Sequence, residues 1–503
     1  MKKILSRIII FSFLFLYASL EADTTPSPRQ VYARSYMFTQ PVFAHHNIEQ
    51  AGWHNIEYNK HGKMRAGFQV IGVYQQSACD TDNQRYFLLP HKNVLLVAGD
   101  NVDTGSECRD IRAEWLGLPS NFSGRMAINP EQKQYGVILD LNQDLGKYFN
   151  CSLFENWFLQ IKMPIVHATN RMNLRQFDVQ EGTPSVYPTA PRDIIQAFDQ
   201  PAWKFSKIPC ERNTLELAAI FLRLGSKFTS EPSGNQVIYY SGLVIPGRRS
   251  ITGEYLFDAT AGYNGHLGIN SGVQFNILLN RNVERFHWCL FANLDDTFLI
   301  RNHSCRTFGL LDNKQGKNTR YSKYLSRYML FNTQCPNQQN VPGVNLLTYR
   351  VMCKPFNMID MGVGFRFTVC DAWEAEIGYS IWGHGKERLV FDRMREFQYN
   401  PSDASSFKFG IAGSSIGKTA SNSTIANQAV DDEEFVAIEL CDLDLESAAT
   451  GGVLNNQAFA ALSYQYFGDN TDCIVSAGWI ATQPQKNSAL TTWTVWAKVG
   501  ATF

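Results

Sequence analysis

Apolar and polar residues alternate in short segments along most of this chain. In the clearest segment, residues 358–369, every second residue from Ile359 to Val369 is apolar, and the positions between them include Asp360 and Arg366. Successive side chains of a β-strand point to opposite faces, so a period of two is typical of a strand. This segment therefore predicts a strand with one apolar face and one polar face.

About twelve segments of about ten residues follow this pattern, which is the length that a tilted membrane-spanning strand needs. They are residues 64–76, 134–145, 156–165, 215–227, 237–246, 266–279, 286–296, 358–369, 373–382, 457–466, 473–482 and 490–503. In 215–227 the alternation is poor, because Glu216 and Arg223 are an odd number of positions apart and would point to opposite faces of a regular strand. A β-bulge between them would reconcile the two. Further strands at 344–353 or 406–412 would extend the expected range to between about ten and sixteen.

The connections between these segments alternate between short and long. The long ones cover roughly residues 77–133, 167–213, 300–355 and 385–455. Short turns on one side and long loops on the other are typical of an antiparallel transmembrane β-barrel with periplasmic turns and extracellular loops. A soluble β-sandwich also alternates but does not need long loops on one side only. We therefore predict an all-β transmembrane barrel.

The last segment, residues 490–503, alternates regularly and ends on Phe503. It resembles the closing strand of bacterial outer-membrane β-barrels, in which a terminal aromatic residue is an assembly signal. The resemblance implies the same role for Phe503 and a location in the bacterial outer membrane. It also implies two partners, the lipid of that membrane and the barrel assembly machinery.

The beginning of the chain has the features of a secretory signal peptide. Lys2, Lys3 and Arg7 precede an uncharged apolar run over 8–20, and cleavage after Ala22 is expected. Three regions follow: a signal peptide (1–22), an irregular N-terminal segment (23–63) and the barrel (64–503). The irregular segment has no clear period, so a periplasmic tail and a segment folded into the lumen both stay open.

Charge and polar faces suggest what the barrel does. The chain has 46 basic and 46 acidic residues, so no net charge points to nucleic acid. We expect a porin, an outer-membrane channel for passive diffusion of small solutes, with a lumen that side chains and loops could still close. The candidate pore-lining residues on the polar strand faces are Asp140, Lys162, Asp360, Arg366, Glu374, Glu376 and Lys498.

An outer-membrane barrel hydrolase and a non-conducting surface or adhesin barrel are the alternatives. His287 and Asp295 share a polar face, but eight positions along a strand separate them by about 25 Å, too far for a catalytic dyad. The segment 412–419, AGSSIGKT, resembles a phosphate loop and also contains G-x-S-x-G, but no helical pattern follows it. We therefore expect no enzyme activity, no cofactor and no metal.

The chain has 11 cysteines. Cys79 and Cys108 share the first long connection and are candidates for a disulfide. Cys151, Cys370 and Cys473 fall at predicted short turns, so disulfide-linked homo-oligomers are a further hypothesis. In barrel plan, signal peptide and cysteine usage, the chain loosely resembles the cysteine-rich major outer-membrane porins of some intracellular bacteria.

Overall fold

The computed structural model describes a large part of the chain in detail. The described residues are 31, 33–53, 66–78, 82–88, 92–104, 109–149, 154–183, 190–230, 234–247, 250–279, 286–311, 325–333, 341–370, 372–391, 409–411, 436–438, 440–468 and 471–503. The expected signal peptide, the 412–419 motif and the cysteine pair Cys79 and Cys108 lie outside these ranges. Within them, no helix has both the length and the apolar character needed to cross a membrane.

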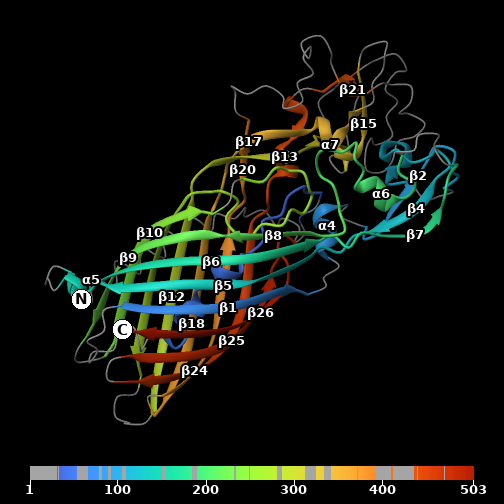
Figure 1. Cartoon of the computed structure of the whole chain (residues 1–503). Helices are drawn as coiled ribbons and strands as arrows, with labels where there is room; N and C mark the ends of the chain where they lie inside the picture. Colours follow the sequence, from blue (N-terminus) through green and yellow to red (C-terminus); the bar gives the residue numbers. More distant parts are fainter. Residues whose placement is uncertain are drawn as a thin grey trace.

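Twelve antiparallel strands form a closed barrel (Figure 1), which confirms the predicted fold class and strand number. Each strand pairs with its neighbour along the chain, and β26 pairs with β1 to close the ring. The strands are β1 (Ala66–Ser77), β5 (Glu131–Asp144), β6 (Trp157–Arg171), β8 (Arg212–Leu217) continued as β9 (Ala219–Thr229), β10 (Gln236–Pro246), β11 (Gly268–Leu278), β12 (Phe286–Leu299), β18 (Asn357–Val369), β19 (Trp373–His384), β24 (Val453–Phe467), β25 (Asp472–Pro484) and β26 (Thr492–Thr502).

Strands β1 and β26 close the ring. The beginning of β1 and the end of β26 lie at the end of the barrel that has the short turns (Figure 1). In the register of this pair, Gly67 lies opposite Thr502. The amide of Ala66 donates to the carbonyl of Phe503 at 3.0 Å. An even number of strands requires this arrangement, because each strand reverses the direction of the chain.

A bulge interrupts the strand formed by β8 and β9. Strand β6 pairs Ile165 with Leu217 above the bulge and Lys162 with Phe221 below it, so one extra residue is inserted between them. That residue is Ala218, whose amide donates to the carbonyl of Pro164 at 2.8 Å. The predicted bulge is confirmed, and it turns both Glu216 and Arg223 toward the interior.

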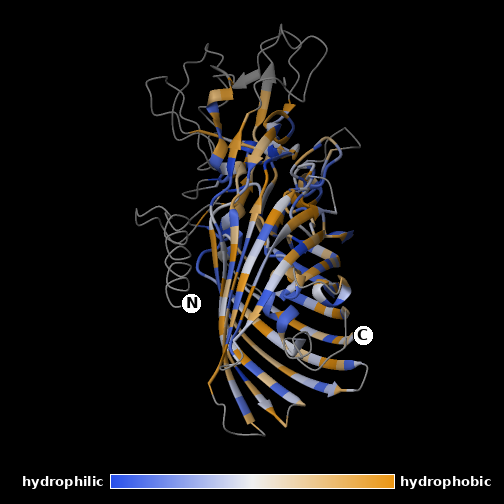
Figure 2. Ribbon diagram, turned by 90° about the vertical axis from the view of Figure 1, so that its left-hand side faces the viewer, coloured by the Kyte–Doolittle hydropathy of each residue, from blue (hydrophilic) through white to orange (hydrophobic). Residues whose placement is uncertain are grey.

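The exterior of the barrel is apolar, and its interior is mainly polar. Ile377 is 56% exposed on the outer surface, whereas its neighbour Glu376 is 3% exposed and points inward. Figure 2 shows the same alternation of hydrophobic and hydrophilic positions along the strands. An apolar outer band around a polar interior is the architecture of transmembrane β-barrels.

The described parts of the long connections form a cap over the other end of the barrel (Figure 1). Its core includes Tyr86, Phe122, Phe198, Phe308 and Tyr328. The extra strands expected near 344–353 and 406–412 are β17 (Thr348–Lys354) and β21 (Phe409–Ile411) of this cap, so they do not enlarge the barrel.

Small sheets and short helices make up the cap. Its strands are β2 (Leu95–Ala98), β3 (Ile111–Arg112), β4 (Ser123–Ala127), β7 (Arg175–Gln180), β13 (Asn302–Thr307), β14 (Gly309–Leu310), β15 (Leu330–Thr333), β16 (Val341–Pro342), β17 (Thr348–Lys354), β20 (Arg388–Val390), β21 (Phe409–Ile411), β22 (Val436–Ala437) and β23 (Leu443–Asp444). Its helices are α4 (Asp82–Phe87), η2 (Ala113–Leu116), α6 (Ile194–Phe198), η4 (Ser326–Tyr328), α7 (Gly343–Leu346), η5 (Leu440–Asp442) and α8 (Leu445–Ala448). Helix α5 (Leu145–Phe149) lies instead in the short turn between β5 and β6.

Part of the irregular N-terminal segment lies inside the barrel. Residues 38–53, which we call the plug, contain the short helices η1 (Val42–Ala44) and α2 (His46–Gln50). Val42, Phe43 and Ile48 are almost fully buried and pack against inward-facing apolar side chains of the wall. Of the two locations left open by the sequence, the structure shows the luminal one for these residues.

Candidate functional site: the plug and the barrel wall

All seven candidate pore-lining residues point into the barrel and are at most 4% exposed. Four of them, Lys162, Asp360, Glu374 and Lys498, bond directly to the plug. The site is therefore the contact between the plug and the wall. Whether solutes pass these seven residues stays a prediction.

The carboxylate of Glu49 on α2 is held between two cations of the wall. One oxygen pairs with the ammonium of Lys162 on β6, and the other lies 3.0 Å from Nη1 of Arg223 on β9. Burial by itself would raise the pKa of Glu49, but Lys162 and Arg223 lower it to about 2. The carboxyl group is therefore ionised at neutral pH.

Wall cations and amides bind the carbonyl groups of the plug. Lys498 Nζ donates to the carbonyls of Ile48 at 3.0 Å and Glu49 at 2.8 Å. Lys162 Nζ also donates to the carbonyl of Phe43, at 3.3 Å. A helix as short as α2 satisfies few of its own carbonyls, so the wall supplies the missing donors.

Wall carboxylates bind the amide groups of the plug. The amide of His46 donates to Asp360 Oδ2 at 3.1 Å, and the amide of Gly52 donates to Glu374 Oε1 at 2.8 Å. Wall lysines thus donate hydrogen bonds to the backbone carbonyls of the plug, and wall carboxylates accept hydrogen bonds from its backbone amides. Buried backbone groups require such partners, which explains how an irregular segment can occupy the lumen.

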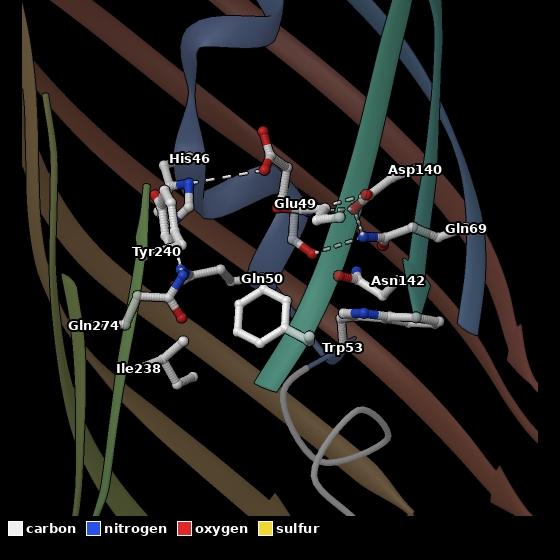
Figure 3. A pocket seen from close by; sticks show the side chains of 12 residues that line it. His46, Glu49, Gln50, Trp53, Gln69, Asp140, Asn142, Ile238, Tyr240 and Gln274 are labelled. Carbon is white, nitrogen blue, oxygen red and sulfur yellow. Dashed lines mark hydrogen bonds and ion pairs between the residues drawn. The ribbon is translucent and has the colours of Figure 1, made fainter. Parts of the chain in front are cut away.

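His46 faces the wall on one side of α2, opposite Gln69 and Asp140 (Figure 3). Its Nε2 accepts from Gln274 Nε2 at 2.9 Å, so the proton of the neutral ring lies on Nδ1, 3.8 Å from Glu49. Burial lowers the pKa of His46, which favours this neutral form. His46 therefore adds a polar contact but no charge.

Arg223 is fixed by further wall residues besides Glu49. Its Nε donates to Asn270 Oδ1 at 2.6 Å, and its Nη2 lies 3.7 Å from Asp295. Asp295 in turn accepts from the hydroxyl of Tyr240 at 2.5 Å. The guanidinium is thus held in place by wall contacts that do not involve the plug.

Amides bind the end of the plug nearer the cap. Asn455 and Gln457 donate to the side-chain oxygen of Gln40 at 2.9 and 3.0 Å. Gln134 donates to the carbonyl of Gln40 at 3.1 Å, and His45 Nε2 lies 3.2 Å from Gln75 Oε1. Neutral hydrogen bonds predominate here, in contrast to the charged contacts around Glu49.

Trp53 lies at the other end of the plug, where two wall glycines leave room for its ring. A Cβ atom added to Gly67 or Gly500 would come within 2.7 or 2.5 Å of the indole. Nearby, Arg366 pairs with Glu376 at 2.6 Å and with Glu374 at 3.3 Å, so this wall group is largely satisfied within itself.

Among the described residues, the cavities beside α2 are small. Two cavities flank the helix, with volumes of about 30 and 20 Å³, and the residues of the larger one are drawn in Figure 3. Such a volume holds about one water molecule. The plug therefore occupies the lumen at this level.

The structure also locates the residues considered for other chemistry. His287 and Asp295 both face inward on β12, and Asp295 bonds to Tyr240 rather than to a histidine. The described residues contain no group of three or more His, Cys, Asp or Glu side chains suited to a metal ion. The hydrolase alternative thus gains no specific support.

Two residues of this site are absent from the pore-lining candidates that the sequence predicts. Glu49 lies in a segment without periodicity, and Arg223 lies in the strand with poor alternation. Only an inserted residue before Arg223 could have indicated its inward direction. Nothing local in the sequence marks Glu49.

No family model and no curated protein matches this chain. Among solved structures, it is similar to an outer-membrane channel from Pseudomonas putida F1, with 9% identity over 88% of this chain and 96% of that chain and a TM-score of 0.38. It is also similar to the Pseudomonas putida toluene transporter TodX, with 8% identity over 94% of this chain and 96% of that chain and a TM-score of 0.34.

The translocator domain of the autotransporter NalP from Neisseria meningitidis is similar at 9% identity over 91% of this chain and 93% of that chain, with a TM-score of 0.28. TM-scores this low do not establish a common fold. The barrel architecture therefore rests on the strand pairing of this chain itself.

Proposed function

We propose that this protein is an outer-membrane channel for passive diffusion of small solutes, and that its structure represents a state closed by the plug. The observation that carries the proposal is the polar inner wall. The wall residues that contact α2 include Lys162, Lys498, Asp360 and Arg223, all at most 4% exposed. A wall built only to enclose a permanent core would not need four ionisable side chains, whereas a water-filled passage is lined by such residues.

The apolar exterior supports the location in a membrane. Leu462, Val475 and Ile377 are each more than half exposed on the outer surface. In water this surface would be unfavourable, whereas in lipid it needs no partner. A closed barrel also leaves no unpaired strand edge, so its backbone groups are satisfied within the bilayer.

The nature of the plug contacts supports a lumen that opens. Around Glu49 they are ion pairs and hydrogen bonds, which water can replace when the plug moves. The plug is also not part of any of the twelve strands. No specific observation favours the hydrolase or the non-conducting barrel.

Planar-bilayer conductance tests the proposal. The purified full chain is compared with a variant in which residues 38–53 are replaced by a Gly/Ser linker of equal length. We expect frequent ohmic steps from the variant and rare steps from the natural chain. Heat-modifiable electrophoretic migration shows in parallel whether the barrel is intact.

An intact barrel that conducts in neither form would contradict the channel and favour a non-conducting surface barrel. Equal conductance of both forms would contradict closure by the plug. A second control replaces outward-facing Val475 by Thr, which leaves the lumen unchanged and should leave conductance unchanged.

A further inference from the structure

Two lysines of the wall depend on the plug for their hydrogen bonds. Among the described residues, Lys162 Nζ donates to Glu49 Oε1 and the carbonyl of Phe43. Lys498 Nζ donates to the carbonyls of Ile48 and Glu49. All four acceptors belong to the plug, so both ammonium groups lose them when the plug leaves.

Arg223 is the third cation that meets Glu49. Its Nε and Nη2 keep the wall partners Asn270 and Asp295 when the plug is absent. Its Nη1 keeps Gln160 at 3.1 Å but loses the Glu49 carboxylate at 3.0 Å. The guanidinium is therefore a positioned donor that faces the vacated space. Three cations from β6, β9 and β26 thus converge on the place of one plug residue.

Two wall carboxylates nearby, Asp140 and Asp295, already have donors from the wall, whereas Asp360 accepts from the plug amide of His46. Asp140 accepts from Gln160 at 2.9 Å and from Gln69 at 2.6 Å. Asp295 accepts from Tyr240 and from Asn270, the latter at 2.7 Å. Because amides and a hydroxyl of the wall already hold Asp140 and Asp295, these two carboxylates are not positioned to replace Glu49 at Lys162.

We propose that Lys162, Arg223 and Lys498 form a binding site for small carboxylate solutes, which Glu49 of the plug occupies in the closed state. This inference deepens the proposed channel function, because it names the class of solute for the same lumen. Each Glu49 oxygen meets its own cation, an arrangement that suits a planar two-oxygen anion.

The surroundings of the site also suit a carboxylate with a small apolar body. The ring of Phe221 lies 4.5 Å from Lys162 Nζ and 5.1 Å from the Arg223 guanidinium carbon. On the plug side, the ring of Phe43 lies in the space that a solute would enter, 5.8 Å from Lys162 Nζ. An apolar group next to the anion would thus replace Phe43.

Chemical rescue of Glu49→Ala in the full chain tests the site. Removing the carboxylate leaves a space between Lys162 and Arg223 that acetate can fill. We expect acetate to raise the thermal unfolding midpoint of this variant in a saturable way. Equal concentrations of chloride and of neutral acetamide should not do so.

Two matched variants make the result specific. Glu49→Gln keeps the volume of the side chain and should show no acetate effect. The double variant Glu49→Ala with Lys162→Gln should lose the effect because the cation is gone. An equal response of the single and double variants, or an equal response to chloride, would overturn the site.

Hydrogen exchange of the natural chain provides a second measurement if Glu49→Ala does not fold. Acetate should compete with Glu49 and speed exchange of the plug amides of His46 and Gly52, relative to chloride. No difference between the two anions would overturn the proposal. Neither assay requires conductance, so the site and the channel can fail separately. If the protein conducts but acetate has no effect, the carboxylate site is refuted and the channel stands. If acetate has its effect but the protein does not conduct, the channel is refuted and the site stands.

Discussion

Ala497 and Lys498 are adjacent in the sequence but lie in opposite environments. Ala497 faces outward from β26, whereas Lys498 is 2% exposed and bonds to the plug. The alternation of a strand decides this difference, since each residue reverses the direction of the side chain. A substitution therefore changes the contact with lipid if the residue faces outward, and it changes the lumen if the residue faces inward.

A charge at Ala497 should destabilise the barrel strongly. Ala497 lies at the middle of β26 and faces outward, so Ala497→Arg is expected to cost about 2–4 kcal/mol in the free energy of unfolding. Ala501→Arg, near the end of the same strand, should cost only about 0–1 kcal/mol. Refolding titrations in lipid measure both, and equal losses would contradict the membrane placement of this strand.

Glu49 should make stability depend on pH in the acid range. Its pKa in the folded protein is about 2, below the ordinary value of 4.5, so its contribution is fully present above that ordinary value. The contribution is lost as the pH falls through the pKa of the folded state. The thermal midpoint of the natural chain should exceed that of Glu49→Gln at neutral pH, and the difference should shrink between about pH 4.5 and pH 2.

The neighbouring histidine is the control for this pH dependence. His46 lies 3.8 Å from Glu49, but burial lowers its pKa, so its titration also falls below neutral pH. His46→Gln should therefore retain the difference between the natural Glu49 and Gln at this position. If the thermal midpoints with Glu49 and with Glu49→Gln no longer differ in the His46→Gln protein, the pH dependence belongs to His46.

At the scale of elements, the bulge at Ala218 decides which side of β9 faces the lumen. Residues 214 and 216 point inward before it, and residues 219, 221 and 223 point inward after it. The extra residue thus changes the parity once. Arg223 reaches Glu49 only because of this insertion.

Deletion of Ala218 should abolish the native barrel or its contact with the plug. Without the extra residue, either Arg223 turns toward lipid or Glu216 does, because a shift by one residue exchanges the two faces. Heat-modifiable migration should show loss of the folded form. Deletion of Glu181, an exposed residue after β7, is the control and should leave the barrel intact.

The elements of the barrel were predictable from sequence, but the plug was not. Strands such as β18 and β26 carry their signal locally, because lipid on one side and a polar lumen on the other impose a period of two. The plug has wall partners on several strands around it, so its polar and apolar residues follow no single period. Its position could therefore not be read from its own residues.

At the scale of the whole molecule, exposed cysteines lie at the end with the short turns. Cys370 directly follows β18, and Cys473 is the second residue of β25. Both are exposed free thiols. Together with Cys151, which lies outside the described residues, these thiols would allow disulfides between neighbouring copies. This remains a prediction, as does the pairing of Cys79 with Cys108.

Electrophoresis of isolated membranes with and without reductant tests the cross-links. We expect higher-mass bands without reductant, and their loss in the triple variant Cys151→Ser, Cys370→Ser and Cys473→Ser. Cys353→Ser is the control, because Cys353 is buried in the cap and cannot reach another copy. Absence of any higher-mass band in the natural chain would refute the cross-links.

The sequence alone determined the barrel of this protein. Alternation, strand length and turn length are local properties, and lipid imposes them on every strand in the same way. The inward direction of the seven candidate residues followed from the same alternation. The even strand number followed from counting these local signals.

Only the tertiary structure decided what fills the lumen. Glu49 and Lys162 are 113 positions apart, and Glu49 and Lys498 are 449 positions apart. Such contacts depend on closure of the whole ring, which brings β6, β9 and β26 around one short helix. A sequence pattern describes the surroundings of each strand, whereas a site shared by distant strands exists only after they have met.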